Sequence, residues 1–169
     1  MKKVVMVISH TGFRDEELLQ PKKILESNNI EVIVASTEST PAHGKLGAVV
    51  NIDRLLRDLT SADFEALFFI GGPGCVAYWD DPLAHKLLRD AFSSGKIVGG
   101  ICSGCVTLAR SGILKEKRAT VFPGDSKELL ENGANYTASL VEKDGNIITA
   151  SGPDAAVAFG REIVRALSE

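Results

Sequence analysis

The sequence predicts an α/β protein whose helices cover both faces of a mostly parallel sheet, because short apolar runs alternate with helical patterns along almost its whole length. The apolar runs carry hydrophobic residues at successive positions, which is typical of strands buried on both faces of a parallel sheet. At 169 residues, 44% hydrophobic and 24% charged, the chain is large enough to bury such a core. We therefore expect a three-layer α/β/α sandwich.

Four apolar runs predict the central strands, since each is rich in β-forming residues and too short for a typical helix. They are Val4–Ile8, Glu31–Ala35, Ala66–Ile70 and Ile97–Ile101. Helical periodicity places four amphipathic helices between or after these strands. The helices span Asp15–Asn28, Pro82–Ser94, Gly104–Ser111 and Pro153–Leu167, with Leu18, Ile24, Leu25, Leu83, Leu87, Leu88 and Phe92 among their inward residues.

Two segments depart from this alternation. Residues 44–51 have the pattern of a short hairpin, and Ala138–Lys143 with Ile147–Ala150 predict a second one. The linking residues Asp144-Gly145-Asn146 suit a tight turn, because Asp-Gly and Gly-Asn readily adopt the required backbone angles. No internal repeat, low-complexity segment or linker interrupts the chain, so we expect a single domain over residues 1–169.

The composition argues against several classes of partner. With 19 basic and 22 acidic residues and a net charge of −3, the chain lacks the basic character of a nucleic-acid-binding protein. No apolar stretch approaches the ~18 residues that a membrane helix needs. Three cysteines cannot all pair within one chain, and they indicate an intracellular setting. We expect a cytoplasmic protein that binds neither nucleic acid nor a membrane.

A candidate nucleophile lies where the fourth predicted strand ends. Gly100-Ile101-Cys102-Ser103-Gly104 matches the nucleophile-elbow pattern, with cysteine in the position of the serine. The flanking glycines allow a sharp turn, which would hold Cys102 at the carboxyl end of a strand, where open α/β sheets bind ligands. The helix that follows would direct its N-terminus at the sulfur and lower the pKa of the thiol.

The cysteines also have structural interpretations. Free cysteines are commonly buried as small apolar side chains, and this is the favoured interpretation of Cys75 and Cys105. Cys102-Ser103-Gly104-Cys105 is also a C-x-x-C motif, in which Cys105 would be a redox partner of Cys102. A metal site is not expected, because the chain has no second C-x-x-C and its histidines are dispersed without ligand spacing.

Two further loops follow predicted strands. Ile70-Gly71-Gly72-Pro73-Gly74 comes after the third strand, and one of its backbone N–H groups, together with that of Ser103, would form an anion pocket over the sulfur. A simple glycine-rich turn is the alternative. Arg14-Asp15-Glu16-Glu17-Leu18 follows the first strand. Acidic residues in a first helical turn usually stabilise the helix dipole, so this pattern does not choose among the three acids.

Taken in order, these motifs resemble the ThiJ/PfpI superfamily along essentially the whole chain. The resemblance rests on Glu17-Leu18-Leu19-Gln20-Pro21, on Ile70-Gly71-Gly72 and on the elbow at Cys102. Towards the C-terminus, residues 141–149 and Ser151-Gly152-Pro153 are similar to the branch that contains the Parkinson-disease-associated deglycase.

This resemblance implies a flavodoxin-like fold, a homodimer or larger homo-oligomer, and no cofactor. Cys102 resembles the reactive cysteine of the family, and Glu17 resembles the buried glutamate that hydrogen-bonds it. The N–H groups of Gly72 and Ser103 resemble the anion pocket. The implied activity is that of a cysteine-dependent glyoxalase or deglycase, which acts on small α-oxoaldehydes or glycated groups and has a role in stress responses.

The sequence departs from the family at several positions. Ser103 stands where PfpI-type peptidases have a histidine, and Val76 stands where they have a glutamate donated by a neighbouring subunit. Phe122 replaces a histidine of the human-type deglycase. Without an imidazole the cysteine lacks its usual base for acyl transfer, so a peptidase is not expected. Asp154 replaces a small residue, and helix capping is its simplest role.

Glu17 and Cys102 are expected to share one proton, because two adjacent anions are unfavourable and burial raises the pKa of a carboxyl group. A protonated Glu17 beside a thiolate suits an enzyme in which Cys102 adds to an α-oxoaldehyde. It equally suits a redox sensor or chaperone in which Cys102 is oxidised to sulfenate or sulfinate. An amidase or hydratase that uses the Ser103 hydroxyl is a third alternative.

Overall fold

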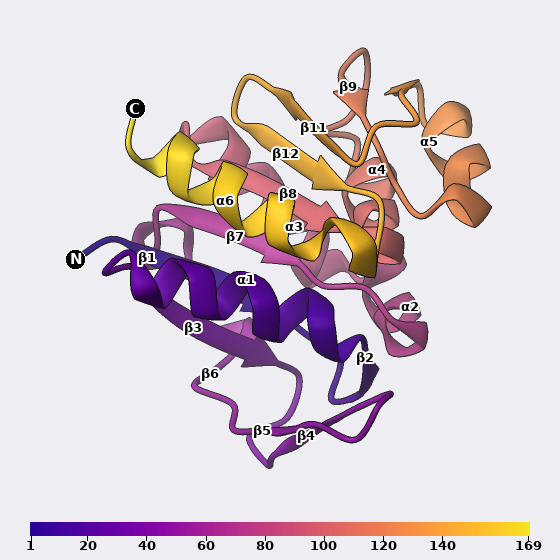
Figure 1. The fold of residues 1–169 in the computed structure, drawn as a ribbon. Coiled ribbons are helices and arrows are strands. Elements are labelled where there is room, and N and C mark those ends of the chain that lie inside the picture. The colour runs from indigo at the N-terminus through magenta and orange to yellow at the C-terminus, as the bar shows by residue number, and fades with distance from the viewer.

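A computed structural model describes all of residues 1–169 and shows a flavodoxin-like α/β/α sandwich (Figure 1). Its central sheet has seven strands in the order β11-β12-β8-β7-β1-β3-β6, and only β11 runs antiparallel to its neighbour. In chain order these strands are β1 (Lys3–Val7), β3 (Glu31–Ser36), β6 (Arg54–Leu55), β7 (Ala66–Phe69), β8 (Ile97–Ile101), β11 (Val141–Asp144) and β12 (Ile147–Ala150).

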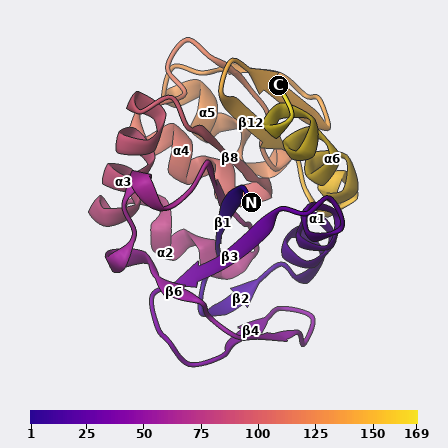
Figure 2. The same cartoon turned by 90° about the vertical axis from the view of Figure 1, so that its left-hand side faces the viewer.

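Helices cover both faces of this sheet, as Figure 2 shows in a view along its edge. The helices α1 (Asp15–Ser27) and α6 (Ala156–Leu167) pack side by side on one face. The other face is covered by α3 (Pro82–Ser93) and α4 (Cys105–Ser111), and the short helices α2 (Val76–Trp79) and α5 (Ser126–Glu131) pack against α4.

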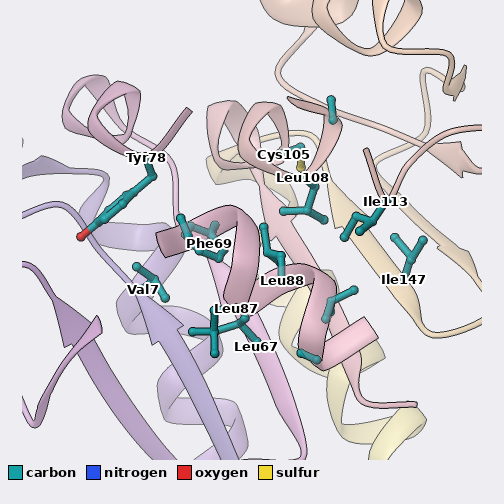
Figure 3. Packing of buried hydrophobic residues seen from close by; sticks show 14 of the residues in the cluster. Val7, Leu67, Phe69, Tyr78, Leu87, Leu88, Cys105, Leu108, Ile113 and Ile147 are labelled. Atoms are coloured by element: carbon teal, nitrogen blue, oxygen red, sulfur yellow. The ribbon is translucent and has the colours of Figure 1, made fainter. Parts of the chain in front are cut away.

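The hydrophobic core therefore has two halves, one on each face of the sheet. Successive residues of a strand point to opposite faces, so Val4 and Met6 pack under α1 and α6, whereas Val5 and Val7 pack under α3 and α4. All four side chains are fully buried, which explains why the first strand is apolar at successive positions. Figure 3 shows the half under α3 and α4, where Leu67, Phe69, Leu87, Leu88, Leu108 and Ile147 converge.

The predicted elements agree with the structure to within a few residues. The four central strands and the helices α1, α3 and α4 are confirmed, whereas α6 begins at Ala156 because Pro153–Ala155 forms a 3-10 turn. Both hairpins are present as antiparallel pairs, β4 (Ala42–Gly44) with β5 (Val49–Val50) and β11 with β12. None of the helices is long and apolar enough to cross a lipid bilayer.

One inward residue and several short elements were predicted wrongly or missed. Leu83 was expected to face the core, but its side chain is 53% exposed in the first turn of α3, where Ala84 is buried instead. The missed elements are α2, α5, β6 and the short strands β2 (Thr11–Phe13), β9 (Arg118–Ala119) and β10 (Asn135–Tyr136). Such segments are too short to show a periodicity of their own.

Candidate functional site

The three predicted site segments meet at one end of the sheet. Strands β8, β7 and β1 are neighbours and run parallel, so the loops that follow them emerge at the same edge. Cys102 follows β8, Gly72 follows β7, and Glu17 lies in the first turn of α1, after β1. The topology therefore brings together residues that are separated by up to 85 positions in the chain.

Cys102 occupies a sharp turn between β8 and α4. Its φ angle is +60°, a left-handed value that is uncommon for a residue other than glycine. The 3-10 turn Cys102–Gly104 follows at once and leads into α4. A Cβ atom on Gly104 would lie 2.3 Å from the carbonyl oxygen of Phe69, so only glycine fits there. This is the strand–turn–helix geometry that the elbow pattern predicts.

Glu17 is completely buried next to the Cys102 side chain. Its Oε1 atom accepts a hydrogen bond from the Gly71 N–H at 3.0 Å, whereas its Oε2 atom has no hydrogen-bond partner. A Cβ atom on Gly71 would lie 2.6 Å from Glu17 Oε1 and 2.7 Å from Cys102 Cβ. The carboxyl group and the cysteine therefore flank the Cα atom of Gly71, and the glycine is what lets them approach each other.

Burial raises the pKa of Glu17 to about 8, and hydrogen bonds from the Cys102 thiol and the Gly71 N–H only partly oppose this effect. Glu17 is therefore mostly protonated at neutral pH, as the sequence predicted. A neutral carboxyl group costs much less to bury with an unpartnered oxygen than a carboxylate does, which agrees with a protonated Glu17.

The predicted lowering of the Cys102 pKa is wrong in direction. Burial raises the pKa of this thiol to about 12, and the negative charge of an ionised Glu17 raises it further. Hydrogen bonds with the backbone and the side chain of Ser103 lower it, but burial outweighs them. Enclosure in the core therefore disfavours the thiolate of Cys102.

A pocket of about 330 Å³ opens in front of Cys102. Gly72 and Ser103 lie in its wall beside the cysteine, as the predicted anion pocket requires. Cations and aromatic rings complete the lining. The full set is Arg14, Lys45, Gly72, Pro73, Val76, Trp79, Cys102, Ser103, Phe122 and Pro153. Such a pocket fits a small polar molecule that is held between a polar and an apolar wall.

The other sequence candidates lie outside this cluster. Cys105 is fully buried, and its thiol donates to the carbonyl oxygen of Ala150 at 3.7 Å in the core half under α3 and α4 (Figure 3). Cys102 belongs to the other half, and both cysteines are free thiols in this structure, so a redox pairing between them stays a prediction. Cys75 is also buried, and Asp154 is exposed in the turn before α6. No group of three or more His, Cys, Asp or Glu side chains is arranged to hold a metal ion.

Asp125 contacts the site, but the sequence did not indicate it. Asp125 Oδ2 accepts a hydrogen bond from the Ser103 hydroxyl at 2.6 Å, and the Ser103 hydroxyl lies 4.0 Å from the sulfur of Cys102. Asp125 ends the 3-10 turn Pro123–Asp125, in a stretch for which the sequence predicted no element. Asp125 belongs to no sequence motif, whether judged by its spacing from Cys102 or by its neighbours in the chain, that would have indicated a place in the site.

Comparison with known proteins agrees with this geometry. The family model described as the DJ-1/PfpI family matches residues 2–166. The chain belongs to the DJ-1/PfpI family. Among solved structures, a ThiJ/PfpI domain protein from Brachyspira murdochii is 37% identical, with a TM-score of 0.96 over 98% of this chain and 96% of that chain.

Relatives within the DJ-1/PfpI family carry different activity names. A deglycase of Pyrococcus abyssi is 31% identical over 96% of this chain and 98% of its own length. A glutathione-independent glyoxalase of Caenorhabditis elegans is 27% identical over 98% of this chain and 89% of its own. A Bacillus subtilis relative named as a candidate cysteine protease is 31% identical over 99% of both chains. Family membership therefore does not by itself select one activity.

Proposed function

We propose that this DJ-1/PfpI protein is a cysteine-dependent, cofactor-independent enzyme of the glyoxalase or deglycase type. Its substrates would be small α-oxoaldehydes such as methylglyoxal, or glycated groups, which implies a role in stress responses. The observation that supports this proposal is the fully buried Glu17, whose pKa burial raises to about 8, beside Cys102, which lines a small pocket. A carboxyl group that holds its proton near neutral pH can serve first as an acid and then as a base.

The reaction would begin with attack of the Cys102 sulfur on the aldehyde carbon. A C–S bond forms, the proton of the thiol is released to solvent water, the electrons of the C=O double bond move to the oxygen, and the N–H groups of Gly72 and Ser103 stabilise the negative charge. Glu17 donates its proton to this oxygen and becomes a carboxylate. It can then remove the proton from the former aldehyde carbon and return it to the neighbouring carbon, while the hydroxyl proton moves through solvent water to the former ketone oxygen, which yields a thioester. Water hydrolyses the thioester to a hydroxy acid and restores the thiol, and Glu17 recovers from solvent the proton that the thiol released in the first step.

The pocket lining supports a small substrate rather than a peptide. Phe122 and Val76 stand where the sequence analysis identified a histidine and a glutamate in other family members, and both line the pocket with apolar side chains. No histidine lines it. A peptidase would need a base for the leaving amine, and a histidine is the usual one beside a cysteine. We also propose a cytoplasmic location and a homodimer or larger homo-oligomer as the working form.

Methylglyoxal consumption by freshly reduced protein tests the proposal. We expect turnover by the wild type and its loss in both Cys102→Ser and Glu17→Gln, because the first removes the nucleophile and the second removes the transferable proton. Cys105→Ala is the matched control, since Cys105 lies outside the pocket, and it should keep its activity. A wild type that is inert although its thiol can be alkylated would overturn the proposed enzyme and favour a redox sensor.

A further inference from the structure

Two cationic side chains, Arg14 and Lys45, lie in the wall of the pocket in front of Cys102. No aspartate or glutamate lines this pocket. In a volume of about 330 Å³, a molecule of a few heavy atoms can contact the cysteine and the cationic wall at the same time. The reaction steps proposed above use neither cation, so both are available to recognise another part of a bound molecule.

Lys45 has no anionic partner within the chain. Its side chain is exposed, and none of the ion pairs of the protein includes it. A lysine ammonium group carries three hydrogen-bond donors and no acceptor. The charge of Lys45 and all three of its donors are therefore free for a ligand.

The turn that carries Lys45 is fixed to the start of α1. Lys45 directly follows β4, the middle strand of the small sheet β2-β4-β5. The Asp15 carboxylate, which is only 7% exposed, accepts hydrogen bonds from the Leu46 N–H at 2.9 Å and from the Ala48 N–H at 2.8 Å. A Cβ atom on Gly44 would lie 2.3 Å from Asp15 Oδ1, so only glycine allows this close approach.

This anchoring has two consequences. Both oxygens of Asp15 are occupied by backbone N–H groups, so Asp15 holds the turn rather than pairing with the ammonium group of Lys45. The backbone of Lys45 is also placed before a ligand arrives, which reduces the entropy that binding would cost.

Arg14 directly precedes Asp15 and supplies the second cation of the wall. Its Nε and Nη2 atoms donate to the Glu16 carboxylate, each at 3.0 Å, whereas Nη1 has no acceptor in the chain. Glu16 offsets the charge of Arg14, so the uncompensated positive charge of the wall is that of Lys45. A single positive charge suits a carboxylate, which has one negative charge, better than a phosphate monoester, which has close to two.

We propose that Lys45 and the free Nη1 edge of Arg14 bind a carboxylate of the substrate, so that the pocket favours small aldehydes that carry such a group. Both residues are binding residues, and Asp15 is a positioning residue that acts through the turn at Lys45. The aldehyde rests on the proposed function, whereas the recognition of a carboxylate does not.

Within the proposed function, the preferred class is α-oxoaldehydes with a carboxylate at the far end. An example is the analogue of methylglyoxal in which a carboxyethyl group replaces the methyl group. The reaction keeps its balance, because the substrate takes up one water molecule and yields a hydroxy dicarboxylic acid and a proton. The neutral amide of the same compound has the same length and reacting carbons, and it is the matched comparison.

Alkylation of Cys102 by iodoacetate and by iodoacetamide tests the carboxylate site without any turnover. The two reagents differ in a carboxylate against an amide. With both, the sulfur displaces iodide, a C–S bond forms, and the thiol proton goes to the buffer. Mass spectrometry measures the two rates at Cys102, and their ratio is divided by the same ratio for a free small thiol.

We expect this normalised ratio to favour iodoacetate in the wild type and to fall roughly 10-fold in Lys45→Gln, because a charge-assisted hydrogen bond is lost. Lys45→Arg keeps a cation and should retain most of the preference. Lys23→Gln is the matched control, since Lys23 is exposed and lies outside the pocket, and it should keep the wild-type ratio.

Glu16→Gln should change the ratio in the opposite direction. Glu16 does not line the pocket, and its substitution releases the guanidinium group of Arg14 for a ligand. We expect the preference for iodoacetate to rise severalfold. Glu131→Gln makes the same change in net charge on exposed α5 and should leave the ratio unchanged. Added salt should weaken the wild-type preference, because it screens charges at an exposed site.

A wild-type ratio equal to that of the free thiol, or an unchanged ratio in Lys45→Gln, would overturn the proposal. An equal fall in Lys23→Gln would also overturn it, since the effect would then be one of net charge. Turnover of the acid analogue and of its amide separates this inference from the proposed function. If neither compound is consumed while the alkylation preference holds, the proposed enzyme is refuted and the carboxylate site stands. If both are consumed equally well and Lys45→Gln leaves the alkylation ratio unchanged, the enzyme stands and this inference fails.

Discussion

Cys102 and Cys105 are three positions apart in the chain, but they lie in the two different halves of the core. Cys102 adopts a left-handed backbone conformation and contacts a buried acid, a hydroxyl group and a pocket. Cys105 is helical and is enclosed by aliphatic side chains such as Leu108. The comparison teaches that a cysteine can take part in chemistry only where polar groups and an opening adjoin it, and the turn after β8 provides both for only one of the two.

Glu17→Gln should change the pH dependence of stability more than any other substitution. Burial raises the pKa of Glu17 from 4.5 to about 8, so the folded protein keeps a proton that the unfolded chain releases above pH 4.5. The stabilisation is complete below pH 4.5, and the wild type should lose about 4 kcal/mol of unfolding free energy between pH 4.5 and 8. The variant should lose little over this range.

Urea denaturation at pH 5, 6, 7 and 8 measures this slope. Glu131→Gln is the control, because Glu131 is exposed on α5 and its substitution should leave the wild-type slope intact. Equal slopes in the wild type and Glu17→Gln would mean that Glu17 is ionised in the folded protein, and the two halves of the core would then differ less than the structure indicates.

Gly71→Ala should directly disturb the packing of Cys102 against Glu17. The added methyl group would lie 2.6 Å from Glu17 Oε1 and 2.7 Å from Cys102 Cβ, so both side chains must move apart. We expect a stability loss of about 1–3 kcal/mol from overpacking and a loss of activity of roughly 100-fold from the displaced reacting groups. Thermal denaturation and methylglyoxal turnover measure the two effects. Gly152→Ala is the control, because no atom lies within 4 Å of its added methyl group.

Cys105→Ser and Cys102→Ser should have opposite effects on stability and on turnover. The hydroxyl group would enter an apolar core half in which only the Ala150 carbonyl oxygen is within reach, at a cost of about 1–2 kcal/mol. Its turnover should remain, whereas Cys102→Ser should lose turnover at nearly unchanged stability. Chemical denaturation measures the stability of both variants, and turnover assays measure their activity. If Cys105→Ser also lost turnover while folded, the two cysteines would be coupled after all.

Phe122→Ala should produce the smallest effect on stability. Phe122 lines the pocket but is 45% exposed, so removing its ring should cost about 0.5 kcal/mol or less. Loss of an apolar wall should raise the KM for methylglyoxal severalfold and leave kcat nearly unchanged, which is the pattern of uniform binding. A large fall in kcat with an unchanged KM would show that the ring positions the reacting groups.

Much of the fold could be predicted because the central strands carry short apolar runs with hydrophobic residues at successive positions. Val4–Ile8 and Ile97–Ile101 are buried on both faces, and this burial is visible as hydrophobicity at successive positions. Short strands such as β9 and β10 pair over two residues each and are held by their neighbours rather than by their own propensity. Leu83 was wrongly assigned to the core because the boundary between the apolar and polar faces is poorly defined in the first turn of a helix such as α3.

The sequence by itself determined the position of Cys102 in the turn after a strand, its neighbours Gly72 and Ser103, and, through the family resemblance, its pairing with Glu17. These residues lie in local patterns whose backbone conformation requires particular residue types. Only the tertiary structure decided the direction of the pKa shifts and the contact between Ser103 and Asp125, because burial and distance depend on which segments pack together. Glu17 retains its proton and the pKa of Cys102 rises because both are enclosed by α1 and the strand ends. Asp125 reaches Ser103 only through the folded turn after Phe122, which no spacing along the chain reveals.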